Sequence, residues 1–319
     1  MSSKKLEKAA LLALKDYMCI TEDETLLVIT DALTNEVGRA LYEAGLNLSN
    51  EAFYMEMRER EVNGQEPPEQ IAELMRTVDV VMCATSKSLT HTKARILASK
   101  QGVRVGTMPG INVGIMERCF SANPNDIISL NEKLQHLLKH TKEIKLVSKA
   151  GTDATFKANG RRIISSTGVL KNIGDSGNVP SGEVYFAPVE GVTSGRLVCD
   201  GSAAGIGLLD EPIVIDIVDG FANKISGDDK AKKLEDMLSK VGHYAHAVAE
   251  FGIGTNPKAE IKGYILEDEK VLGTVHIAFG NNQSMGGNIN VPIHIDCIIK
   301  NPSFYFDGKL IMDEGKFLI

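Results

Sequence analysis

The first 140 residues alternate short apolar runs with amphipathic stretches, and this rhythm restricts the possible folds more than any other feature. Strands are expected at Thr25–Thr30, Ala52–Met57, Val78–Ala84 and Val103–Thr107. Apolar residues at helical spacing between and after these runs predict helices, and the segment 1–16 also has a helical pattern. Because strands that alternate with helices pair in parallel through right-handed crossovers, the sequence predicts a mostly parallel α/β domain.

The pattern changes near Ile144, after which the chain becomes rich in β-strand and glycine signals. Strands are expected at Ile144–Val147, Asp153–Lys157, Arg161–Ser165, Glu183–Ala187, Gly195–Asp200, Ile213–Val218 and Ala245–Glu250. One clear amphipathic helix, Asp228–Lys240, interrupts them. We therefore predict two domains, 1–143 and 144–319, in an α/β fold whose N-terminal, mostly parallel α/β domain is followed by a β-rich α+β domain.

Composition excludes several classes of function. The net charge is −7 and no basic stripe is present, so a nucleic-acid partner is not expected. The longest apolar runs are too short to span a bilayer, and the first 16 residues lack the pattern of a signal peptide. The five cysteines are scattered without a CxxC pair, which indicates reduced thiols in a cytoplasmic protein. No glycine-rich nucleotide-binding motif follows a strand of the first half.

The segment from His276 to Asp296 has the residues of a metal site. Two runs with period-two alternation flank a loop rich in glycine and amide side chains, so both runs are read as strands. His294 and Asp296 then project from the same face of one strand, and His276 lies on the other. Two imidazoles and a carboxylate form a set of metal donors. The alternative is a pair of core histidines that hydrogen bonds satisfy.

Two further carboxylates stand at the ends of expected strands beside small residues. Glu183 follows the turn Pro180-Ser-Gly, and Glu250 precedes Phe-Gly-Ile-Gly-Thr. Taken singly, each is more simply read as a surface or salt-bridged carboxylate. Together with the residues above they offer three carboxylates and two imidazoles, a donor set suited to two divalent ions that share a bridging carboxylate.

Four sequence blocks resemble the aminopeptidase T (thermophilic-type) family of metallopeptidases. They are Gly182-Glu183-Val, Glu250-x-Gly-x-Gly-Thr-Asn-Pro, Gly273-Thr-Val-His276-Ile-Ala and Gly286-Gly-Asn…His294-x-Asp296. Their order and rough spacing match the family, and shorter similarities extend into the first half. The resemblance implies a two-metal site of zinc, cobalt or manganese whose ligands are Glu183, Glu250, His276, His294 and Asp296. It also implies a homodimer.

The function that this resemblance implies is a leucyl aminopeptidase-like hydrolase that removes N-terminal residues from peptides. Two ions would activate a water molecule and polarise the scissile carbonyl. Glu183 or Glu250 would transfer the proton, and the sequence does not distinguish a bridging ligand from a general base. The resemblance thus implies that residues 144–319 form a metal-binding catalytic domain, which acts on a peptide or small-molecule substrate.

The chain departs from the family in the loop after His276. That loop is shortened and lacks the tyrosine that the family pattern places near the metals, where a phenol could stabilise an oxyanion. Two alternatives therefore stay open. One is the ring-opening dioxygenase branch of the same fold, which acts on dihydroxypyridines with one iron(II), for which His276, His294 and Asp296 would be a suitable set. The other is a non-catalytic metal-binding protein.

Overall fold

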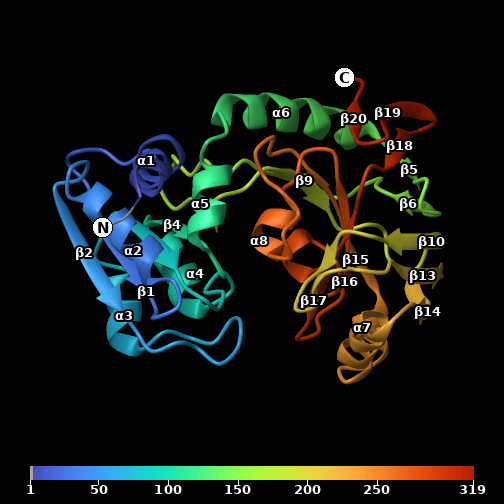
Figure 1. Ribbon diagram of the computed structural model, residues 1–319, viewed down its shortest axis with the longest axis horizontal. Coiled ribbons are helices and arrows are strands. Elements are labelled where there is room, and N and C mark those ends of the chain that lie inside the picture. The colour runs from blue at the N-terminus through green and yellow to red at the C-terminus, as the bar shows by residue number, and fades with distance from the viewer. Residues whose placement is uncertain (1–2) are drawn as a thin grey trace. The chain divides into compact units, whose positions relative to one another are not determined.

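A computed structural model describes residues 3–319, which form two compact units (Figure 1). The first unit contains the chain up to Asp126 together with Ser166–Ser181, and the second contains Ile127–Ser165 and Gly182–Ile319. The domain boundary predicted after residue 143 stays a prediction. The two units differ from the predicted domains in two places. Residues 127–140 belong to the second unit, and Ser166–Ser181 belongs to the first.

The first unit is built on a five-stranded parallel sheet with strand order β2-β1-β3-β4-β8. Its strands are β1 (Thr25–Thr30), β2 (Glu51–Glu56), β3 (Val80–Ala84), β4 (Arg104–Thr107) and β8 (Ser176–Asn178). Its helices are α1 (Lys4–Leu12), α2 (Asn35–Gly45), α3 (Glu69–Leu74), α4 (Lys93–Lys100) and α5 (Val113–Cys119). A π-helical turn, Ala13–Tyr17, continues α1; Met1 and Ser2 of the expected first helix lie outside the described residues.

The second unit contains two sheets and, from Ile127 on, the long helix α6 (Pro124–His140). The eight-stranded sheet has the order β14-β13-β10-β6-β5-β18-β19-β20, and the seven-stranded sheet has the order β12-β11-β17-β16-β15-β9-β7. The first of these sheets comprises β5 (Glu143–Val147), β6 (Asp153–Lys157), β10 (Ser194–Cys199), β13 (Ile213–Val218), β14 (Phe221–Ser226), β18 (Ser303–Phe306), β19 (Lys309–Asp313) and β20 (Lys316–Phe317). The second comprises β7 (Ile164–Ser166), β9 (Glu183–Phe186), β11 (Ser202–Ala203), β12 (Gly207–Leu208), β15 (Val248–Gly254), β16 (Val275–Gly280) and β17 (His294–Ile299). The remaining helices are α7 (Asp229–Ser239) and α8 (Ile265–Asp268), with 3₁₀ turns at His243–His246 and Gln283–Met285. The expected fold class is confirmed.

One hydrophobic core joins the two sheets of the second unit. From β15, β16, β17 and β9 it takes residues of one sheet face only, namely Val248, Phe251, Ile253, Val275, Ile277, Phe279, Ile295, Cys297, Ile299, Val184 and Phe186. Side chains of the eight-stranded sheet, of α6 and of α7 complete this core. Because successive side chains of a strand point to opposite faces, the intervening residues of these four strands share the other face.

Two of the expected strands are wrong in part. Within 161–165 only the last two residues are in a strand, since β7 begins at Ile164. The segment expected as a strand from Ala245 begins with a 3₁₀ turn that follows Gly242 at φ 113°, and β15 starts only at Val248. The short strands β8, β11 and β12 and the C-terminal β18–β20 were not expected, because their apolar runs are too short to show a period.

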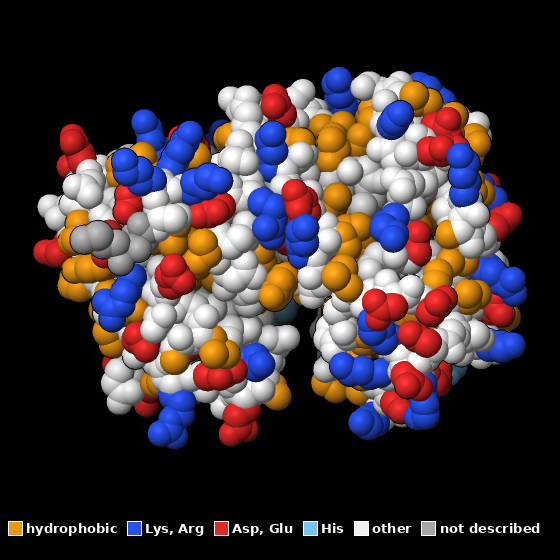
Figure 2. Space-filling model, in the orientation of Figure 1, with side chains coloured by type: hydrophobic (Ala, Val, Ile, Leu, Met, Phe, Trp, Pro, Cys, Tyr) orange, Lys and Arg blue, Asp and Glu red, His pale blue; other side chains and the backbone are white. Residues whose placement is uncertain are grey.

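Charge and hydrophobicity at the surface are ordinary for a globular chain. On the face drawn in Figure 2, lysine and arginine side chains are interspersed with aspartate and glutamate over the described residues. Among residues 3–319, none of the helices is both long enough and apolar enough to cross a bilayer. The five cysteines are free thiols, four of them buried.

An ion pair between buried Arg104 and partly exposed Glu24 in the first unit leads to a pH-dependent prediction. Arg104 donates two hydrogen bonds of 2.7 Å to the two carboxylate oxygens of Glu24, which hold the pKa of Glu24 below its ordinary value. A carboxyl whose folded-state pKa is lowered adds stability above its unfolded pKa and loses it as pH falls through the folded value. Glu24→Gln should therefore lower the free energy of unfolding by about 1.5–3 kcal/mol at neutral pH.

The measurement is urea unfolding of wild type and variant at pH 7 and near pH 3. The difference between the two proteins should shrink at the acidic pH. Glu22→Gln, on the exposed loop before β1, is the matched control and should change stability little. A difference for Glu24→Gln that stays constant with pH would contradict the prediction.

Candidate metal centre

All five sequence-predicted residues lie on the polar face of the seven-stranded sheet. The antiparallel register aligns Glu183 with Gly254, Gly252 with His276, and Ala278 with both Glu250 and Asp296; Gly280 pairs with His294. Directly paired residues share a face, so each of these side chains has a glycine or alanine beside it, and His276 also pairs with Ile298. The small neighbours leave space for the functional groups to approach one another.

Backbone contacts hold Glu183 at the start of β9. Gly182, which precedes it, has φ 144°, and a Cβ at this position would lie 2.8 Å from the Cβ of Asn256. Thr255 N–H donates to the carbonyl of Gly182 at 2.8 Å, and the side-chain amide of Asn131 on α6 donates to the carbonyl of Glu183 at 2.8 Å. The turn before β9 therefore needs glycine, both for its backbone angle and for its close approach to Asn256.

His276 lies directly over the backbone of β15. A Cβ added to Gly252 would meet Nε2 of His276 at 1.9 Å, so this imidazole occupies the space that any other residue would fill. A β-bulge between Val248 and Glu250 shifts the register of β15 and turns Glu250 toward the same face. The ring and the carboxylate are thus placed together by a glycine and by an irregularity of the strand.

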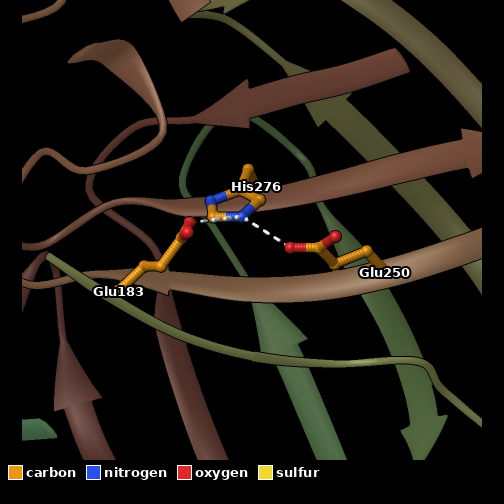
Figure 3. Close-up of side chains that lie close together, drawn as sticks. All are labelled: Glu183, Glu250 and His276. Atoms are coloured by element: carbon orange, nitrogen blue, oxygen red, sulfur yellow. Dashed lines mark hydrogen bonds and ion pairs between the residues drawn. The ribbon is translucent and has the colours of Figure 1, made fainter. Parts of the chain in front are cut away.

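The five side chains form a continuous series of close polar contacts. Nε2 of His276 lies 3.1 Å from Oε1 of Glu250 and 3.5 Å from Oε2 of Glu183, so the imidazole stands between two carboxylates (Figure 3). Nε2 of His294 lies 3.3 Å from the other oxygen of Glu250 and 3.4 Å from Oδ1 of Asp296. Glu250 is therefore the residue that connects the two halves of the site.

The donor atoms form two groups, each with the spacing of a metal site. The atoms of Glu183, Glu250 and His276 lie within 4.8 Å of one another, and so do those of Glu250, His294 and Asp296. Both groups combine imidazole nitrogen with carboxylate oxygen, which suits first-row divalent metals such as iron(II), manganese and zinc. The described residues can therefore bind a metal ion.

Hydrogen bonding distinguishes the two histidines. Nδ1 of His294 lies 2.7 Å from the carbonyl oxygen of Asn281, which can accept its proton. Nε2 then faces Glu250 and Asp296 and is the nitrogen that a metal ion would bind in place of a proton. Nδ1 of His276 is buried and has no hydrogen-bond partner. His294 thus has the outer hydrogen bond typical of a metal-bound imidazole, and the group Glu250, His294 and Asp296 fits an ion better than the other.

The charges of the site favour a cation. Burial would raise the pKa of Asp296, but the charge of His294 and its hydrogen bond lower it to about 2. Burial would lower the pKa of His276, but the hydrogen bond with Glu250 and the nearby carboxylate charges raise it to about 9. In the metal-free chain, protons on the imidazoles thus provide positive charge that the carboxylates stabilise. A metal ion that binds here must displace protons.

The sequence did not identify two ionisable residues of this site, Glu269 and Lys270. Lys270 is 1% exposed, and its ammonium donates to Oε1 of Glu183 at 2.7 Å and also contacts Glu269. Both residues follow α8 in a loop, and in the sequence they end the run Glu-Asp-Glu-Lys, which has the pattern of solvated charges. No local signal indicates that this lysine is buried.

The family model described as "NicX: 2,5-dihydroxypyridine 5,6-dioxygenase" matches residues 9–319. A 2,5-dihydroxypyridine 5,6-dioxygenase from Pseudomonas putida is 25% identical over 192 residues, which make up 56% of this chain and 55% of that protein. The alignment thus covers about half the length of this curated relative.

Two solved structures are similar over nearly the whole chain. The structure of 2,5-dihydroxypyridine dioxygenase from Pseudomonas putida has a TM-score of 0.86 at 19% identity and covers 100% of this chain and 98% of that one. Wild-type AmpT from Thermus thermophilus has a TM-score of 0.73 at 16% identity and covers 99% of each chain. At these identities the two structures show a shared fold.

The close approach at Gly252 provides a test of the site. Gly252→Ala should push the His276 ring away from Glu250 and lower metal affinity by ~10–100-fold, as loss of a supporting contact does in other metal sites. Titration calorimetry with Mn²⁺ on chelator-treated protein measures the change. Gly177→Ala is the control, since an added Cβ there meets its nearest heavy atom, Cδ2 of Leu170, at 3.7 Å. Unchanged affinity in Gly252→Ala would contradict this geometry.

Proposed function

The chain belongs to the 2,5-dihydroxypyridine 5,6-dioxygenase family, and on this basis we propose that it is a ring-opening dioxygenase that uses one iron(II) ion. The observation that carries the proposal is the donor group of Glu250, His294 and Asp296, whose two carboxylates are buried, on a chain that the family model matches over residues 9–319. The proposed substrate class is a dihydroxypyridine, by analogy with the activity that names the family.

The expectation of a metallo-aminopeptidase is wrong, because the family model and the curated relative both name a dioxygenase. The enzyme class therefore changes from hydrolase to oxidoreductase. AmpT has the same fold, so the four blocks that suggested a peptidase identify the strands of the metal centre and leave the reaction open. The loop 281–290, where the expected tyrosine is missing, is where the sequence already departed from the peptidase pattern.

The donor set supports iron chemistry. Two imidazoles and one carboxylate are the donor set typical of non-haem iron(II). His294 and Asp296 supply one of each, and His276 adjoins their group through its contact with Glu250. The sequence analysis named a different set of three ligands, in which His276 takes the place of Glu250 beside His294 and Asp296. That set also remains a proposal. Bound iron(II) would supply the one-electron chemistry by which dioxygen reacts with an aromatic ring.

The protein residues prepare the site for this chemistry in two ways. Glu183, Glu250 and Asp296 are each less than 10% exposed, which excludes bulk water from the carboxylates. His294 has 31% of its side chain exposed, so we propose that a small substrate reaches the ion from this side. Glu250, expected as a ligand and a proton-transfer residue, keeps only the role of a ligand in this proposal. The two oxygens of Glu183 contact Lys270 and His276, one each.

Of two further expectations, one is replaced and the other stays a proposal. The pair of zinc, cobalt or manganese ions followed from the aminopeptidase resemblance, and the present proposal replaces it with one iron(II). The homodimer also stays a prediction, which light scattering on the purified protein would test.

Replacement of Asp296 tests the proposal directly. Asp296→Asn should lower iron-dependent ring opening of 2,5-dihydroxypyridine by at least ~100-fold, because the amide replaces a charged ligand. Oxygen uptake with an electrode and the loss of substrate absorbance measure the reaction, and iron content is determined in parallel. Asp216→Asn, which removes an aspartate paired with the half-exposed Arg196, is the control and should keep full activity.

The proposal fails if iron-loaded wild type consumes no oxygen with any dihydroxypyridine. It fails equally if Asp296→Asn keeps wild-type turnover. In the first case metal binding without turnover would indicate a binding protein.

A further inference from the structure

Lys270 has surroundings unlike those of any other lysine of the described residues. Its side chain is 1% exposed, and its ammonium lies between the carboxylates of Glu183 and Glu269. The contact with Glu183 is made to Oε1, at 2.7 Å, while Oε2 of the same carboxylate faces His276 at 3.5 Å. A fixed positive charge is thus built into one end of the candidate metal centre.

The position of this ammonium matters because the centre has two donor groups that share Glu250. In a two-metal site the group of Glu183, Glu250 and His276 would hold the second ion. Lys270 already binds one of the two Glu183 oxygens and would lie beside a divalent ion held by the other. The two cations would repel each other in a buried site, where such repulsion is weakly screened.

We propose that Lys270 replaces the second metal ion: its ammonium neutralises Glu183 and restricts the centre to one ion, held by the group of Glu250, His294 and Asp296. Lys270 is in these terms a positioning residue that determines how many metal ions bind. The inference rests on the proposed metal site and deepens it, since one-ion chemistry distinguishes an iron dioxygenase from a two-metal hydrolase.

The local charge balance supports this role. Among the described residues, the ammonium of Lys270 contacts the carboxyl groups of both Glu183 and Glu269. Glu250 and Asp296 contact only imidazoles among the described basic groups, so a divalent cation would balance their charge. Each pair of carboxylates therefore has a different counter-charge, a lysine for one pair and a metal ion for the other.

The test counts bound ions and does not depend on turnover. Wild type and Lys270→Met are stripped with a chelator, equilibrated with excess Mn²⁺, freed of unbound metal and analysed for manganese per chain. We expect about one ion in wild type and about two in Lys270→Met, where the second donor group is released. Electron paramagnetic resonance separates the cases, because two neighbouring Mn²⁺ ions couple and broaden the six-line spectrum of an isolated ion.

Two companion variants make the result interpretable. Lys270→Arg keeps the charge and should bind one ion. Lys270→Met leaves two buried carboxylates without a counter-charge, so Lys270→Met/Glu269→Gln, which removes one of them, serves if the single variant does not fold. The double variant should also bind two ions.

Two outcomes overturn the inference, namely two ions in wild type, or one ion in a folded variant that lacks the lysine. Neither outcome coincides with failure of the proposed function. Wild type that binds one ion and opens no ring refutes the dioxygenase proposal and leaves the role of Lys270 intact.

Discussion

The second unit depends on one electrostatic constraint: ionisable groups buried on a sheet face must alternate in sign. From the loop after α8 to β17 the contacts run in the order Glu269, Lys270, Glu183, His276, Glu250, His294, Asp296. Four carboxylates face one ammonium and two imidazoles. Removing a carboxylate from water costs several kcal/mol unless an opposite charge or hydrogen bonds replace the lost hydration. The series ends in the carboxylate of Asp296, where a bound metal ion would add positive charge.

The same strands perform two tasks that do not interfere, because their two faces are chemically separate. On one face, residues such as Phe251, Ile277 and Cys297 pack into the core shared by both sheets. On the other face, glycine and alanine alternate with the functional side chains. Packing of the apolar face fixes the register of each strand. The register then places His276 over Gly252 and Asp296 opposite Ala278. The apolar face thus holds the strands in place, and the polar side chains on the other face need not contribute to this packing.

Local period explains which parts of this arrangement the sequence could predict. The strand pattern identified the five donors and their common face, because alternation is a property of neighbouring residues and needs no knowledge of the fold. It failed where tertiary contacts override local preference. The bulge that turns Glu250 toward the site, the 3₁₀ turn before β15 and the burial of Lys270 each depend on residues distant in the chain. The α/β rhythm of the first unit was predictable for the same reason as the strands, since each of its elements is long enough to show a period.

The motifs that pointed to a peptidase show what donor residues alone can determine. Aspartate, glutamate and histidine on paired strands form donor groups suited to a metal ion, and AmpT shares this fold. The reaction depends on features outside the blocks: how many ions the surrounding charges permit, and what the loop between β16 and β17 places over them. In this chain a buried lysine contacts Glu183, and the loop 281–290, rich in amides, contacts His294 through the carbonyl of Asn281. A lysine that follows an acidic run is therefore the residue to examine when a metal motif leaves two chemistries open, because one positive charge decides whether a second divalent ion can bind.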